Sequence, residues 1–478
     1  MKKTSFFYSK NLTGGGVANS TINIEWVCTM KLERFKEKSS RKKFIIVFTV
    51  VCILLLAGVF LYTSFAVFTE EKQFNVINGT YQDPGDLYFS VYIDGQITNT
   101  FPKKEDGYLF DSTQSSCTNG ATVSWDEDSW SALVNFSNYQ AGNLSKTKCT
   151  MYFRGSIVSK IIAQLDTTGV CPTVNEDGTV NITGAETEKS LVCSAPDDYG
   201  TSYYFRGNVE NNWVKFAGYY WRIIRVNGDG TLRMIYSGDA SVIDALKNKE
   251  EVLKNGYDDS TTRYTQIGES AFNENFNDNA YVGYMYGTPG SSTYEETHAN
   301  INNSTIKTYI DNWYATHLLN TEYEKYLSDT LFCNDRSLND ESSDAGMNTA
   351  QTYYRVYSAR TLLCKGVNNR FTVNDKTIGN GNLTYPIASV TTDEMHLAGE
   401  YYMVNNIKFY LYTGNTYWTI TPADFSGSSA FVRFMDNSTI NMIQNNYVYN
   451  IGGIRPVINV KANTFQNGDG TALNPYRQ

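Results

Sequence analysis

The chain has 478 residues and a formal net charge of −9, with 36 Tyr and 36 Gly against 9 Pro and 3 His. This length predicts roughly two or three folded units, and the Tyr-rich composition favours β-structure over coiled coil or disorder. The negative balance argues against nucleic-acid binding, because such proteins need clustered Lys and Arg to neutralise phosphates.

The N-terminal segment, residues 1–43, is a basic tail, in which residues 1–29 precede an alternative start at Met30. An uninterrupted apolar run follows from Phe44 to Phe68, which is long enough to span a bilayer as one helix. The seven Lys and Arg residues between Met30 and this run predict a cytoplasmic N-terminus. The sequence therefore predicts a single-pass plasma-membrane protein whose C-terminal domains are extracellular.

A cleaved signal peptide is the alternative, since Ser64 and Ala66 form a small-x-small pattern at the end of the apolar run. The run is longer than the apolar part of most signal peptides, which is about 7 to 15 residues. An uncleaved membrane anchor is therefore preferred.

Six of the eight cysteines follow the apolar run, and they fall into three local couples. In an oxidising compartment this arrangement favours structural disulfides, predicted here as Cys117–Cys149, Cys171–Cys193 and Cys333–Cys364. A zinc site is the competing hypothesis, but the chain has no CxxC, and His298, His317 and His396 lack ligand spacing. We expect no resident metal.

Residues 70–155 predict a small immunoglobulin-like β-sandwich that serves as a spacer. Apolar and polar residues alternate over Leu87–Asp94, and Asp94-Gly95 supplies a hairpin turn. Further strands are expected at 132–136 and 150–153, and a disulfide between strands would be typical of this fold.

Residues 156–169 predict a linker helix, since Ile157, Ile161, Ile162 and Leu165 follow helical spacing. In the remaining unit, residues 170–478, Tyr219–Val226 and Thr231–Tyr236 form a predicted hairpin around an Asn-Gly-Asp-Gly turn. A helix capped by Asn303 or Ser304 comes next, and the final strands are expected at 416–421, 430–434 and 453–460.

Several strings of this unit occur together in one order: WRIIRVNGDGTLRMIY (221–236), DTLFCNDRS (329–337), FTVNDKTIGNGNLTYPIASVTTDE (371–394), YWTITP (417–422) and GIRPVINV (453–460). This combination resembles a family of uncharacterised membrane-anchored surface proteins of low-GC Gram-positive gut bacteria. The last two strings also resemble the C-type-lectin-like fold of formylglycine-generating enzymes and retroelement-diversified receptors.

The expected fold class is α+β: a single N-terminal transmembrane helix, a small immunoglobulin-like β-sandwich and, as the resemblance implies, a C-terminal C-type-lectin-like mixed domain. The resemblance also implies an exposed recognition surface in the last domain, formed by Trp418, Arg433, Asn437, Asn441, Asn445, Asn446 and Tyr447.

Catalytic and cofactor motifs are missing from the sequence. The formylglycine-generating oxidases use paired cysteines near the closing strands, whereas no Cys follows Cys364. The sugar-binding motifs of calcium-dependent lectins are absent too, so no cofactor is predicted, although loops at Asp229 and Asp469 are compatible with weak calcium binding. His396 lies beside Asp393 and Glu394 without a GxSxG context, which favours a structural histidine.

These observations predict a cell-surface binding or adhesion protein that recognises a glycan or a protein through residues 170–478. The alternatives are an enzyme acting on envelope polymers through the same domain, and a structural envelope protein without a ligand.

Overall fold

The computed structural model describes residues 87–98, 100–127, 129–135, 147–186, 188–239, 265–338, 349–350, 359–402, 404, 408–437 and 442–478. All of them belong to one compact unit, Phe74–Gln478. The predicted basic tail and the predicted span Phe44–Phe68 lie outside the described residues. Within the described ranges, none of the helices has the length and apolar character needed to cross a membrane.

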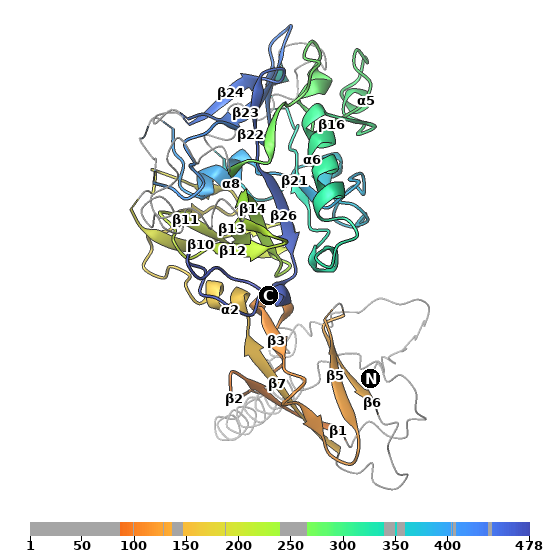
Figure 1. The fold of residues 1–478 in the computed structure, drawn as a ribbon, viewed down its shortest axis with the longest axis vertical. Coiled ribbons are helices and arrows are strands. Elements are labelled where there is room, and N and C mark those ends of the chain that lie inside the picture. The colour runs from red at the N-terminus through yellow and green to blue at the C-terminus, as the bar shows by residue number, and fades with distance from the viewer. Residues whose placement is uncertain are drawn as a thin grey trace, which may run out of the picture. The chain divides into compact units, whose positions relative to one another are not determined.

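The architecture is predominantly β, so the predicted α+β fold class is wrong. The described residues contain four short α-helices, which are α2 (Ile157–Ile162), α5 (Tyr294–Thr297), α6 (Thr305–His317) and α8 (Thr392–Leu397). Five short 3-10 helices accompany them: η4 (Lys104–Asp106), η6 (Asn279–Val282), η7 (Glu324–Tyr326), η8 (Val367–Asn369) and η9 (Ala462–Thr464). Strands make up most of the regular secondary structure of the described residues, and Figure 1 colours them by their place in the chain.

The N-terminal sheet has the strand order β2-β1-β7-β3, and β4 also pairs with β7. Its strands are β1 (Leu87–Ile93), β2 (Gln96–Thr98), β3 (Tyr108–Phe110), β4 (Ser116–Cys117) and β7 (Thr147–Gly155). The predicted turn between β1 and β2 is present, with positive φ at both Asp94 and Gly95, as a tight hairpin turn requires.

In the described part of residues 70–155, the strand pairing differs from that predicted for an immunoglobulin-like sandwich. Two antiparallel sheets define that fold, whereas β1 here pairs with β7 in parallel, with Leu87 opposite Thr147. The second layer is a single hairpin of β5 (Thr122–Asp126) and β6 (Ser131–Asn135). Val91, Met151 and Phe153 form the core of this module together with the partly buried ring of Trp125.

The first large sheet has the order β10-β11-β13-β14-β26-β21, with β12 on β13. Its strands are β10 (Ser190–Asp197), β11 (Gly200–Gly207), β12 (Trp213–Phe216), β13 (Tyr219–Val226), β14 (Leu232–Asp239), β21 (Ile387–Ser389) and β26 (Pro456–Val460). The predicted β13–β14 hairpin is confirmed. Both strands are buried almost throughout, which explains their near-continuous apolar sequence.

The second large sheet has the order β15-β25-β22-β23-β24, with β19 on β22. Its strands are β15 (Gly268–Ala271), β19 (Thr349–Ala350), β22 (Tyr417–Phe425), β23 (Ala430–Met435), β24 (Ile443–Tyr447) and β25 (Ile451–Ile454). Three small two-strand ladders complete the fold: β8 (Thr173–Val174) with β9 (Val180–Asn181), β16 (Met285–Tyr286) with β17 (Asn302–Asn303), and β18 (Phe332–Cys333) with β20 (Arg370–Phe371).

The predicted strand 453–460 is split between the two large sheets. It leaves the second sheet as β25 and joins the first as β26, and the break falls at Arg455. The Arg455 side chain is buried and donates hydrogen bonds to the carbonyls of Tyr236 and Leu411 and to the Ser237 hydroxyl, each at 3.1 Å. This arginine therefore fixes the crossing point of the chain between the sheets.

The helices join the sheets into one core. The linker helix is confirmed in shortened form as α2, and Ser156 caps it by accepting a hydrogen bond from the Val158 backbone N–H. Ser304 caps α6, one of the two predicted candidates, and Ile306, Ile310 and Tyr314 of that helix are buried. Helix α8 contacts both β11 and β22, and Figure 1 shows it between the two large sheets.

Candidate functional site

Two residues of the predicted recognition surface are buried and cannot meet a ligand. Trp418 is fully buried on β22, where its indole N–H donates to the Ser270 carbonyl at 2.9 Å and its ring packs 4.7 Å from that of Phe434. Arg433 on β23 is 1% exposed. The resemblance predicted that both side chains face a ligand, but their strands, β22 and β23, lie inside the second large sheet.

The other predicted residues lie towards the edge of this sheet, apart from Asn441, which lies outside the described residues. Asn437 is exposed just after β23, and its carbonyl accepts a hydrogen bond from the Tyr412 hydroxyl at 3.1 Å. Asn445, Asn446 and Tyr447 belong to β24, the terminal strand of the sheet in the described part of the chain. Among the predicted surface residues that the structure describes, Tyr447 is the one exposed aromatic side chain.

Tyr447 belongs to a continuous line of four aromatic rings, here called the aromatic row: Phe431, Tyr447, Tyr449 and Phe276. Phe431 and Tyr447 are cross-strand neighbours with ring centroids 4.4 Å apart. Tyr447 stacks on Tyr449 at 5.2 Å, and Tyr449 meets Phe276 edge-on at 4.8 Å. Tyr447, Tyr449 and Phe276 keep 39%, 42% and 41% of their surface exposed.

Backbone hydrogen bonds hold the three segments that carry this row. The N–H of Ala430, at the start of β23, donates a hydrogen bond to the Phe276 carbonyl at 2.8 Å, and the Ala430 carbonyl accepts one from the Val448 N–H at 3.1 Å. The Asn273 N–H donates to the Val448 carbonyl at 3.0 Å. The rings therefore share one preformed platform and do not have to be assembled by a ligand.

The residues flanking the aromatic row are mostly uncharged and rich in amides and hydroxyls. Asn275 and Asn277 flank Phe276, Ser428 and Ser429 precede β23, and Asn445 and Asn446 precede Tyr447. The Asn450 amide donates to the Asn446 side chain at 2.6 Å. Such a surface presents flat apolar faces beside neutral hydrogen-bonding groups.

A second cluster of polar residues surrounds a charged cavity of about 30 Å³, which has room for about two water molecules. Two arginines and five acids are among its lining residues: Arg225, Arg233, Asp197, Asp198, Asp335, Asp393 and Glu394. They are carried by β10, β13, β14, α8 and neighbouring loops. The cavity is too small for an organic ligand in this conformation.

Both arginines of this cavity are paired with carboxylates of its lining. Arg225 pairs with Asp197 at 2.7 Å and with Glu394 at 3.1 Å, and Arg233 also pairs with Glu394. Burial alone would raise the pKa of Glu394, but the guanidinium groups of Arg233 and Arg225 outweigh burial and hold this pKa below its usual value. The network joins β13 and β14 to α8, so its geometry indicates a structural role.

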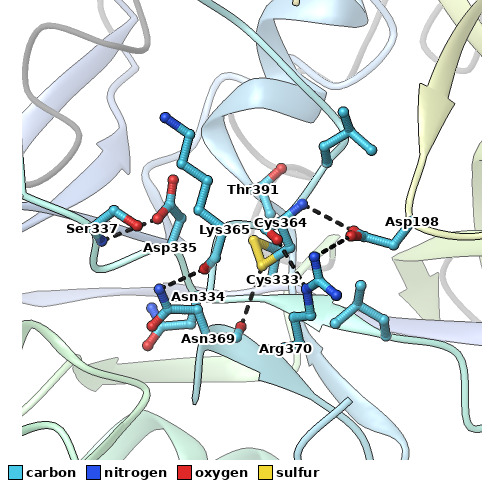
Figure 2. Close-up of a disulfide and its surroundings, with 12 residues drawn as sticks. Asp198, Cys333, Asn334, Asp335, Ser337, Cys364, Lys365, Asn369, Arg370 and Thr391 are labelled. Atoms are coloured by element: carbon cyan, nitrogen blue, oxygen red, sulfur yellow. Dashed lines mark hydrogen bonds and ion pairs between the residues drawn. A yellow bond between two sulfur atoms is a disulfide. The ribbon is translucent and has the colours of Figure 1, made fainter. Parts of the chain in front are cut away.

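A disulfide closes one side of the cavity. Cys333 and Cys364 are bonded, as are the two other predicted couples, Cys117–Cys149 and Cys171–Cys193, so the disulfide prediction is confirmed. Figure 2 shows Asp198 beside the Cys333–Cys364 bond, where it accepts the Cys364 N–H at 2.9 Å and pairs with Arg370 at 2.9 Å. These contacts extend the charged network into the disulfide loop.

The described residues contain no group of three or more His, Cys, Asp or Glu side chains placed to hold a metal ion. His396 lies in the last turn of α8, and its Nδ1 is 2.5 Å from a carboxylate oxygen of Glu400, which follows the end of the helix. Both partners are fully buried.

Sequence reasoning missed three of the four rings of the aromatic row. Phe276 and Phe431 lie on segments that only the tertiary structure brings beside Tyr447, so no local pattern joins them to it. Tyr449 lies two residues after Tyr447, and this short spacing was a signal that could have found it. Comparisons of the chain with protein-family models, curated proteins and solved structures found no match.

Proposed function

We propose that this protein is an extracytoplasmic binding protein that recognises carbohydrate through the aromatic row. The observation that carries the proposal is the preformed line of four rings, three of them about two-fifths exposed. Exposed aromatic patches on folded proteins mark interaction sites, because leaving such surface in water is unfavourable. The proposal keeps Tyr447, Asn445 and Asn446 from the predicted recognition surface and adds Phe276, Phe431 and Tyr449.

The chemistry of the row favours a sugar chain. The C–H faces of sugar rings pack on aromatic faces, and sugar hydroxyls exchange hydrogen bonds with neutral amides such as those of Asn446 and Asn450. A typical protein partner would cover about 800 Å² on this side, of which four partly exposed rings supply only a part. A narrow row therefore suits an extended, uncharged chain better than a broad protein surface.

The three disulfides support a location outside the cytoplasm, because structural disulfides persist in oxidising compartments. Membrane attachment through the N-terminal apolar run stays a prediction of the sequence. Display on the cell surface would place a carbohydrate-binding row where envelope or host glycans are met.

The test is a glycan array probed with the full-length chain, purified in detergent, and with its Tyr447→Ala variant. Tyr88→Ala is the matched control, because Tyr88 is 54% exposed on β1 and lies outside the row. We expect binding to neutral oligosaccharides that Tyr447→Ala weakens and Tyr88→Ala leaves unchanged.

Assaying the same wells for released sugars separates binding from cleavage. Product release would replace the binding proposal by the enzyme alternative. Absence of binding to every glycan would refute carbohydrate recognition and favour a protein partner or a structural role.

A further inference from the structure

The second large sheet ends on an open backbone edge. Its terminal strand, β24 (Ile443–Tyr447), pairs with β23 on one side, and no strand of the described residues pairs with its other side (Figure 1). The Val448 N–H donates to the Ala430 carbonyl and the Asp436 N–H to the Met442 carbonyl, at the two ends of this pairing. Hydrogen-bonded pairs alternate along an antiparallel ladder. The even-numbered residues of β24 therefore bond to β23, and the odd-numbered residues point their backbone groups away from the sheet.

These outward groups belong to Ile443, Asn445 and Tyr447. In the described part of the chain, the Tyr447 carbonyl is engaged, since it accepts the Asn450 N–H at 3.0 Å. The three outward N–H groups have no acceptor among the described residues. An unpaired row of backbone groups is a template to which another strand can be added.

The other terminal strands of the two large sheets are covered. At the far end of the second sheet, β15 contacts helix α6. In the first sheet, β10 contains Pro196 and forms bridges to Leu165 and Leu362, and all three residues of β21 are buried. Covering an edge or placing a proline in it prevents strand addition. Among the described residues, β24 has neither protection.

The sequence around β24 also lacks the charges that commonly block an edge. Residues 437–454 contain no charged residue and no proline. The three central side chains of the strand, Gln444, Asn445 and Asn446, are neutral amides that can both donate and accept hydrogen bonds. Two copies of this strand can therefore approach each other without repulsion between like charges.

We propose that β24 is a self-association edge, through which two copies of this chain pair antiparallel about a two-fold axis. In the register centred on Asn445, each Asn445 lies opposite its equivalent in the other copy. Ile443 then lies opposite Tyr447, and Gln444 lies opposite Asn446. Such an interface is self-complementary, and every outward N–H of one strand meets an outward carbonyl of the other.

The pairing goes beyond the proposed carbohydrate binding and does not depend on it. Backbone bonds form in the plane of the sheet, whereas side chains project to its two faces, so the aromatic row keeps its face when the edge is occupied. A pair of five-residue strands buries less than the roughly 800 Å² per partner of a typical stable interface. We therefore expect a weak dimer, with a dissociation constant in the micromolar to millimolar range.

The experiment measures the self-association of the full-length chain in density-matched detergent by sedimentation velocity, from micromolar to millimolar protein. Gln444→Lys/Asn446→Lys places like charges opposite each other and should raise the dissociation constant at least about tenfold. The matched control is Gln96→Lys/Thr98→Lys, which adds the same charge to β2, the terminal strand of the N-terminal sheet. It should leave the dissociation constant unchanged.

A charge-swapped partner tests the register itself. Gln444→Glu/Asn446→Glu should also fail to self-associate, but its mixture with the double-Lys variant brings opposite charges together and should restore association. Asn445→Pro removes one outward N–H from each copy and keeps the bonds to β23, so it should raise the dissociation constant at least about fivefold.

Three results would overturn the proposal, given near-UV circular dichroism that shows each variant to be folded. The first is a wild-type chain that stays monomeric over the whole concentration range. The second is a double-Lys variant that associates as strongly as wild type, since the contact would then lie elsewhere in the chain. The third is a mixture of the double-Lys and double-Glu variants that associates no more strongly than either protein alone.

Discussion

Glu394 holds together the largest set of buried charges described in this fold, and Glu394→Gln tests its role directly. The carboxylate pairs with both Arg225 and Arg233, and it also accepts the Thr391 backbone N–H at 3.0 Å as part of the capping box of α8. The substitution keeps the shape of the side chain and removes its charge. Arg225 retains Asp197, whereas the pairing of Arg233 with Glu394 is lost.

Removing one partner of a buried ion pair costs about 3–5 kcal/mol, because the remaining charge stays desolvated without compensation. Arg233 is 1% exposed, so its charge stays largely removed from bulk water after the substitution. The total stability of a folded domain is about 5–15 kcal/mol. Glu394→Gln should therefore remove a large fraction of the free energy of unfolding.

The assay is denaturant unfolding followed by near-UV circular dichroism, with oxidised protein throughout. Glu188→Gln is the matched control: Glu188 pairs with Lys408 at 2.9 Å, but their side chains are 70% and 53% exposed, so the loss should be at most about 1 kcal/mol. Equal effects of the two substitutions, or a loss below about 1 kcal/mol for Glu394→Gln, would refute the assignment of the charged cavity as a structural centre.

Two further predictions concern the same region. Because the folded pKa of Glu394 is held below its usual 4.5, its stabilising contribution is present above that pH and is lost as the pH falls through the lower folded value. Unfolding midpoints measured from neutral to acidic pH should therefore fall less steeply for Glu394→Gln than for wild type, and parallel curves would contradict this. Replacing Cys333 and Cys364 together by Ala opens a link between residues 31 positions apart, which predicts a loss of about 3–4 kcal/mol. A denaturant midpoint unchanged from that of the oxidised wild type would show that this disulfide does not stabilise the folded chain.

Local features of the fold were predictable from sequence. The β1–β2 and β13–β14 hairpins carry their own turn signals, and Ser304 caps α6 next to its first turn. The disulfides could be paired because each joins cysteines near one another in the chain, at separations of 32, 22 and 31 residues. In each case the information lies within a few dozen residues.

Long-range pairing was not predictable from the same patterns. Strand β14 pairs with β26, where Leu232 lies opposite Val460, and β1 pairs in parallel with β7 across the whole N-terminal module. Trp418 and Arg433 resemble ligand-facing residues by type, but their neighbours in the second large sheet bury them. The residues that bury these side chains are distant in the sequence, and no local pattern in one sequence shows which strands will pair.

The binding account depends above all on the exposed rings of Tyr447 and Tyr449. The most direct test is a calorimetric titration of the best-bound neutral oligosaccharide into the full-length chain and into a Tyr447→Ala/Tyr449→Ala variant. Each aromatic contact is worth about 0.5–1.5 kcal/mol, so losing two should weaken binding about fivefold to 150-fold. The account predicts a dissociation constant raised by at least about fivefold, and an unchanged dissociation constant in the folded variant would contradict it.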